Sequence, residues 1–132
     1  MRYIQTLGFA AVASLAFAFF VPAAEPTKAS LSEIKNEVDS GKAVLVDVRE
    51  AREWNSGHVE GAIFLPLSAL QDGLSKEELA KLPKDRTLYV HCVVGKRALA
   101  AANVFEQHGY QAEAVKPGYR ELVSAGFPAA QD

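Results

Sequence analysis

The sequence of 132 residues contains a single cysteine, Cys92, and this scarcity is its most informative absence. With only one cysteine, an internal disulfide is excluded. Exported proteins usually pair their cysteines, so an unpaired one in such a chain indicates a reactive thiol. The alternative is a structural role, because a free cysteine often serves as a small buried hydrophobic residue. The count alone leaves both interpretations open.

An excess of charge is also lacking. The chain has 14 basic and 16 acidic residues, and its formal net charge is −2. Arg2 is the only charged residue among the first 23, so the remainder carries a net charge of about −3. This mild acidity and the absence of a basic stripe argue against nucleic acid as a partner. The sequence also has no internal repeat, and its length suits one small domain that is stable as a monomer.

The longest apolar run, residues 7–21, lies near the start of the chain. It follows a positively charged start at Arg2 and precedes the small residues Ala23 and Ala24, an order typical of a secretory signal peptide. We predict that residues 1–23 are a signal peptide cleaved after Ala23, with Ala24 as the alternative site. An uncleaved membrane anchor competes with this interpretation, but the run is short against the roughly 20 residues that a bilayer requires. We therefore expect an exported protein, periplasmic or secreted, that is free of the membrane after cleavage.

Beyond the leader, strands and helices alternate. Residues 24–29 read as a short disordered lead, residues 30–128 as one domain and residues 129–132 as a tail. Strands are expected at 43–48, 59–65, 87–91 and 111–116, and helices after Ser30, at 50–55, from Leu67, after Ser75, from Arg97 and at 119–124. Such alternation predicts an α/β fold, a small parallel sheet with helices on both faces.

The segment 91–97 joins the third expected strand to a helix. Ligands of open parallel sheets lie beyond the carboxyl ends of the strands, where Cys92 stands. From Val93 onward, backbone N–H groups have no partner within the helix, and the helix dipole favours an anion there. Gly95 permits a tight backbone path, and Lys96-Arg97 adds positive charge. These features favour a Cys92 thiolate, the nucleophile that sulfur transfer requires.

Together these segments resemble the rhodanese family. The loop Cys92-Val-Val-Gly-Lys-Arg97 is similar to the rhodanese active-site loop, and the segments 46–49, 53–54, 57–62, 109–110 and 118–119 resemble other family motifs. The likeness spans about residues 30–128. It implies a rhodanese-like domain that moves sulfane sulfur from thiosulfate or a similar donor to cyanide or a thiol acceptor, through a Cys92 persulfide.

The resemblance also implies roles for individual residues. Cys92 would carry the sulfur. The loop residues Val93, Val94, Gly95, Lys96 and Arg97 would bind the substrate: their amides would hold the persulfide, and the two cations would attract the anionic donor. No cofactor or metal is implied.

Three further residues near the site are expected to be structural. Asp47 and Arg49 would tie the first strand to neighbouring loops, and His58 would hold a turn. We also expect His91 to be buried and hydrogen-bonded rather than a general base, because adjacent residues of a strand point to opposite faces.

Rival interpretations remain. A phosphatase loop has its arginine six positions after the cysteine, whereas Arg97 is the fifth, so this loop is one residue short for phosphate. A non-catalytic protein-binding module is a second alternative, although inactive versions typically lack the cysteine. A third is a partner-specific sulfur relay with little activity on thiosulfate. The apolar pair Val93-Val94, where many members have polar residues, would suit docking to a partner protein.

Overall fold

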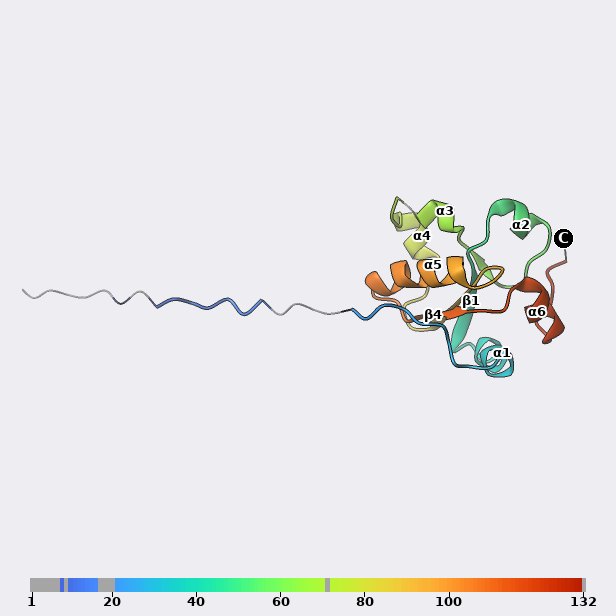
Figure 1. The fold of residues 1–132 in the computed structure, drawn as a ribbon, viewed down its shortest axis with the longest axis horizontal. Helices are drawn as coiled ribbons and strands as arrows, with labels where there is room; N and C mark the ends of the chain where they lie inside the picture. Colours follow the sequence, from blue (N-terminus) through green and yellow to red (C-terminus); the bar gives the residue numbers. More distant parts are fainter. Residues whose placement is uncertain (1–7, 9, 17–20, 71, 132) are drawn as a thin grey trace, which may run out of the picture.

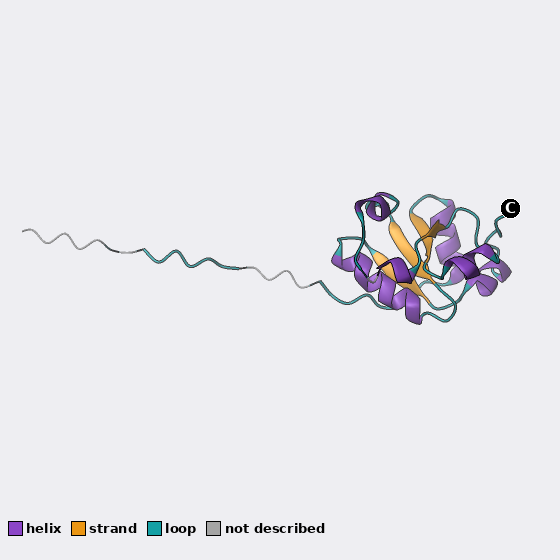
Figure 2. Ribbon diagram, turned by 90° about the horizontal axis from the view of Figure 1, so that it is seen from above, coloured by secondary structure: helices purple, strands orange, loops and turns teal. Residues whose placement is uncertain are grey.

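The computed structural model describes residues 8, 10–16, 21–70 and 72–131. Four parallel strands, β1 (Ala43–Asp47), β2 (Ile63–Phe64), β3 (Thr87–His91) and β4 (Ala112–Val115), form a sheet in the order β2-β1-β3-β4. The helices are α1 (Leu31–Asp39), α2 (Ala51–Asn55), α3 (Leu67–Leu70), α4 (Lys76–Ala80), α5 (Lys96–Gln107) and α6 (Tyr119–Ser124). Figure 2 shows them surrounding the sheet. The predicted α/β class with a small parallel sheet is confirmed.

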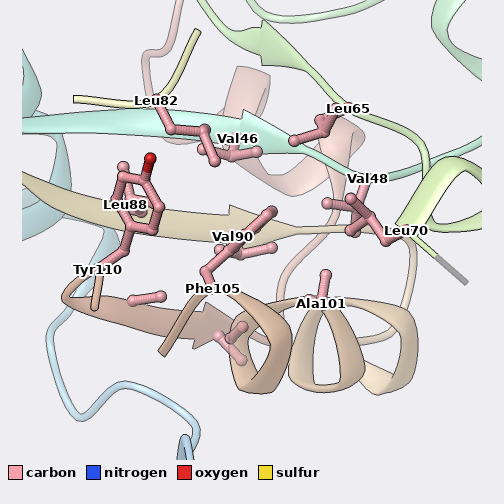
Figure 3. Packing of buried hydrophobic residues seen from close by; sticks show 14 of the residues in the cluster. Val46, Val48, Leu65, Leu70, Leu82, Leu88, Val90, Ala101, Phe105 and Tyr110 are labelled. Atoms are coloured by element: carbon pink, nitrogen blue, oxygen red, sulfur yellow. The ribbon is translucent and has the colours of Figure 1, made fainter. Parts of the chain in front are cut away.

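The sheet separates two hydrophobic cores because successive side chains of a strand point to opposite faces. On one face, Val46 and Val90 pack with Phe105 of α5 and with residues from α3 (Figure 3). On the other face, Leu45 packs with Ile34 of α1 and with α6. Helices therefore cover both faces (Figure 1), as predicted. Burial of each such large apolar side chain stabilises the fold by about 1.5–3 kcal/mol.

Two helices begin at capping boxes that the sequence predicts. At α1, the Glu33 amide donates to the Ser30 hydroxyl at 3.1 Å, and the Ser30 amide donates to the Glu33 carboxylate at 2.7 Å. Ser75 and Glu78 make the same reciprocal pair at the start of α4. Each pair satisfies backbone donors that a helix leaves unpaired at its first turn.

The second strand is shorter than the sequence predicts. Strand β2 includes only Ile63–Phe64, whereas a strand was expected over 59–65. Gly61 has φ +79°, and the Ala62 amide donates to the Val59 carbonyl at 3.2 Å, so the chain makes a turn there. Val59 instead forms an antiparallel bridge with Ala129. The expected tail is thereby attached to the domain.

Residues 24–29, expected to be a disordered lead, lie along β4 at the edge of the sheet. Pro26 forms a parallel bridge with Ala114, and the Thr27 amide donates to the Ala114 carbonyl at 2.7 Å. The Ala24 amide donates to Oδ1 of Asn103 at 2.6 Å. An edge strand has unpaired backbone groups, and this segment satisfies part of them. The segment has no run of β-branched residues, so the sequence pattern did not predict its pairing with β4.

About half of the predicted signal peptide, residues 1–7, 9 and 17–20, lies outside the described residues. Within the described ranges, none of the helices combines the length and the apolar character needed to cross a membrane.

Candidate active site

Cys92 stands at the carboxyl end of β3, and only 1% of its surface is exposed. Its Sγ accepts hydrogen bonds from the amides of Gly95 at 3.1 Å and Ala98 at 3.3 Å. The sequence predicts that amides of residues 93–97 surround this sulfur. In the structure, the donors are the amides of Gly95, which was predicted, and of Ala98, which was not. Val93 and Val94 instead expose 48% and 69% of their surface. Two N–H donors directed at one sulfur favour negative charge on it.

The cysteine loop packs closely against the connection between β4 and α6. Gly95 has φ +98°, and a Cβ placed there would lie 3.2 Å from Cγ of Lys116. A Cβ at Gly118 would lie 2.7 Å from the Val93 carbonyl oxygen and 3.0 Å from that of Cys92. Gly118 therefore requires glycine for space, and Gly95 requires it for its positive φ. Lys116 and Gly118 were not predicted to belong to the site.

Arg97, expected to attract an anionic donor, pairs with Glu53 of α2. The two guanidinium nitrogens lie 2.6 and 2.9 Å from the two carboxylate oxygens. This hydrogen bonding lowers the pKa of Glu53 from 4.5 to about 2, and it raises the pKa of Arg97. The charge of Arg97 is therefore compensated, and the residue links the first turn of α5 to α2. Lys96, beside it, is exposed and makes no ion pair with any residue that the structure describes.

Asp47 and Arg49 form a buried ion pair at the end of β1. Nη2 of Arg49 lies 2.7 Å from Oδ2 of Asp47 and also donates to the Gly57 carbonyl at 2.8 Å. The pair therefore connects β1 to the turn after α2. Nε2 of His91, the neighbour of Asp47 on β3, lies 3.6 Å from the same carboxylate oxygen.

His91 is completely buried, and burial lowers its pKa below the ordinary 6.5. Asp47 opposes this shift, but burial dominates, so the ring is neutral. Its side chain approaches Asp47, and strand alternation directs it to the face of the sheet opposite the Cys92 side chain. His91 donates no hydrogen bond to the sulfur, and its Nδ1 lies 3.4 Å from the Cys92 carbonyl oxygen. The sulfur is held by amides rather than by this imidazole.

His58 lies in the turn after α2. Its ring stacks on Trp54 with centroids 3.6 Å apart, and its Nδ1 lies 3.0 Å from the Trp54 carbonyl oxygen. These contacts hold the turn whose Gly57 carbonyl binds Arg49. In the described part of the chain, no group of three or more His, Cys, Asp or Glu side chains is arranged to hold a metal ion.

Two neighbouring hollows border the site and share Arg49, Tyr119 and Arg120. One, of about 390 Å³, lies beside the cysteine loop and is also lined by Val93, Val94, Gly118 and Glu121. The other, of about 320 Å³, extends toward α2 and is also lined by Arg52, Glu53, Ser56 and Gly57. Arg52 and Arg120 are exposed and were missed by the sequence analysis. Only the packing of α2 and α6 brings these two arginines toward the loop.

A family model, related sequences and solved structures all indicate the same family. The family model described as "Rhodanese-like domain" matches residues 30–125. The chain is 39% identical over 79 residues to the "probable adenylyltransferase/sulfurtransferase MoeZ" of Mycobacterium tuberculosis, covering 59% of this chain and 19% of that protein. It is 36% identical over 90 residues to the human thiosulfate:glutathione sulfurtransferase, covering 61% of this chain and 78% of the relative.

Among solved structures, the human single-domain sulfurtransferase superposes with a TM-score of 0.63 at 33% identity, covering 73% of this chain and 94% of that one. The chain spans about a fifth of the mycobacterial relative, so these comparisons establish a domain family. With the cysteine loop, the sheet order and the family match all in agreement, the chain belongs to the rhodanese-like family.

Proposed function

We propose that this chain is a sulfurtransferase that carries sulfane sulfur as a persulfide on Cys92. The observation that carries the proposal is the pair of amides, from Gly95 and Ala98, that donate to Sγ of Cys92. Donors fixed in this way stabilise a sulfur anion without a general base. The neutral, buried His91 on the other face of the sheet agrees with a mechanism that needs none.

The reaction has two displacement steps. The Cys92 thiolate attacks the outer sulfur of thiosulfate, the sulfur–sulfur bond of the donor breaks, and sulfite leaves with its electron pair. An acceptor, cyanide or a thiolate, then attacks the outer sulfur of the Cys92 persulfide. The bond to Sγ breaks, and the Cys92 thiolate is regenerated. Sulfane sulfur moves without net oxidation or reduction, and neither a metal nor a cofactor takes part.

An anionic donor such as thiosulfate suits the charges around the loop. Arg97 is compensated by Glu53, but Lys96, Arg52 and Arg120 have no acidic partner among the described residues. The human relative is named for thiosulfate and glutathione, which supports both an inorganic donor and a thiol acceptor.

A partner-specific sulfur relay is the second candidate. The exposed Val93 and Val94, at 48% and 69%, favour it because apolar side chains at the rim of a site suit contact with another protein. Slow turnover with cyanide, together with rapid transfer to one protein, would distinguish such a relay from a general sulfurtransferase.

We also propose that the protein is exported, to the periplasm or outside the cell, after cleavage of residues 1–23, and acts as a monomer. The apolar leader supports export. Ala24, the first residue of the proposed mature chain, donates its backbone N–H to Oδ1 of Asn103, and the α-amino group formed by cleavage after Ala23 could donate the same bond.

Intact-mass measurement of the protein after incubation with thiosulfate tests the proposed function. We expect a gain of one sulfur atom that cyanide reverses and that Cys92→Ser lacks. Circular dichroism of Cys92→Ser should match the wild type, because the serine hydroxyl can accept from the same two amides. A gain only with other persulfide donors would favour the relay, and no adduct from any donor would refute the proposal.

A further inference from the structure

The hollow beside the cysteine loop is lined by two guanidinium groups and one carboxylate, Arg49, Arg120 and Glu121. Of its charged side chains, Arg49 is paired with Asp47, and Glu121 accepts a hydrogen bond from the Gly118 amide. Arg120 has no acidic partner among the residues that the structure describes, and it lines both neighbouring hollows. An anionic group in this hollow would therefore find a guanidinium that forms no ion pair, and it would have to lie away from the Glu121 carboxylate in the same lining.

The hollow is larger than a small inorganic anion requires. Its volume of about 390 Å³ lies within the range of about 300–1,000 Å³ typical of sites for small organic molecules. Val93 and Val94 give it an apolar wall on the side of the cysteine loop. An occupant that fits both features has an aliphatic part against the valines and an anionic end toward Arg120.

The hollow adjoins the loop of the sulfur carrier, although the buried Cys92 does not itself line it. Val93 and Val94 directly follow Cys92 in the chain, and Gly118, in the same wall, lies close against the Cys92 carbonyl. A thiol bound along the valines would therefore have its sulfur near the loop that holds the persulfide. Arg52, which lines the adjoining hollow, would provide a second positive charge for a longer molecule with two carboxylates.

We propose that this hollow selects the sulfur acceptor, and that Arg120 recognises the carboxylate of a small aliphatic thiol that removes sulfur from Cys92. The inference rests on the proposed function, since it concerns the second step of the same reaction. In that step the thiolate of the acceptor attacks the outer sulfur of the Cys92 persulfide. The electrons of the broken sulfur–sulfur bond return to Sγ, and the acceptor leaves as its own persulfide. The reaction balances with no further reagent.

The test compares two thiols that differ mainly in charge, 3-mercaptopropionate and 3-mercaptopropan-1-ol, at equal thiolate concentrations. The full mature protein is first loaded with sulfur, from thiosulfate or another persulfide donor, and loading is verified by intact mass. Loss of the outer sulfur is then followed by rapid quenching and mass measurement. We expect wild type to react preferentially with the carboxylate thiol, and Arg120→Gln to reduce that preference about fivefold, the effect of one exposed charge pair. Arg120→Lys should retain part of it.

Arg86→Gln is the matched control. Arg86 is exposed and immediately precedes β3, at the end of the sheet opposite Cys92, so this variant changes the net charge equally without touching the hollow. It should keep the wild-type preference. Equal losses in the two variants, or an unchanged preference in Arg120→Gln, would overturn the acceptor site while leaving the Cys92 carrier intact. Failure of the wild type to take sulfur from any donor would refute the proposed function and this inference with it.

Discussion

Replacing Glu53 by glutamine removes one partner of the ion pair that joins α2 to α5. The pair is bidentate, with nitrogen–oxygen distances of 2.6 and 2.9 Å to Arg97. The side chains of Arg97 and Glu53 are 32% and 25% exposed. Because Arg97 lies in the first turn of α5, which also presents the Ala98 amide to Sγ of Cys92, the pair supports the geometry of the site as well as the fold.

The contribution of this ion pair to the free energy of unfolding follows from the pKa of Glu53, which falls from 4.5 to about 2. Such a difference between the folded and unfolded states corresponds to about 3 kcal/mol. Both side chains contact water, and solvent screening reduces the expected contribution to about 1 kcal/mol. Since the folded-state pKa of Glu53 is depressed, the contribution is complete above pH 4.5 and is lost as the pH falls from 4.5 toward 2.

A double-mutant cycle measures this energy. The free energy of unfolding in urea is determined for wild type, Glu53→Gln, Arg97→Gln and the double variant, at pH 7 and again at pH 3. We expect a coupling of about 1 kcal/mol at pH 7 that shrinks at pH 3. Additive effects of the two substitutions at pH 7 would show that the pair does not stabilise the protein, and a coupling that persists unchanged at pH 3 would contradict the assignment to ionised Glu53.

Two further predictions concern the cysteine loop and the buried histidine. Gly118→Ala should destabilise the protein by about 1–3 kcal/mol and slow persulfide formation, because its Cβ would meet the Val93 and Cys92 carbonyls; wild-type stability and rate would contradict this. Gly41→Ala, which strains φ +78° in open space, is the control and should leave the rate unchanged. Because burial lowers the pKa of His91, the unfolded chain binds a proton that the folded chain does not, so the free energy of unfolding should decrease as the pH falls from 6.5 to 5. His91→Leu should flatten this slope in urea titrations, and an unchanged slope would assign the effect to other groups.

The regular elements could be predicted from the sequence because their signals are local. Capping boxes at Ser30 and Ser75 involve residues only three positions apart, and the apolar run at 43–48 indicates a strand buried on both faces. The predicted strand at 59–65 was too long because Gly61 allows a turn within it. Residues 24–29 have no strand pattern of their own, and their position depends on bonds to the backbone of β4 and to the side chain of Asn103.

Part of the candidate site could likewise be predicted from the sequence, and part depends on tertiary structure. The sequence alone placed Cys92 between a strand and a helix, because the order of the elements along the chain determines this position. It also predicted that the side chains of His91 and Cys92 point to opposite faces of the sheet, because side chains alternate along a strand. Tertiary structure decided which amides contact Sγ, and it paired Arg97 with a residue 44 positions earlier in the chain. It also placed Arg120 beside the loop. These contacts depend on how α2, α5 and α6 pack around the sheet, and pairings between segments so distant along the chain leave no periodic signal in a single sequence.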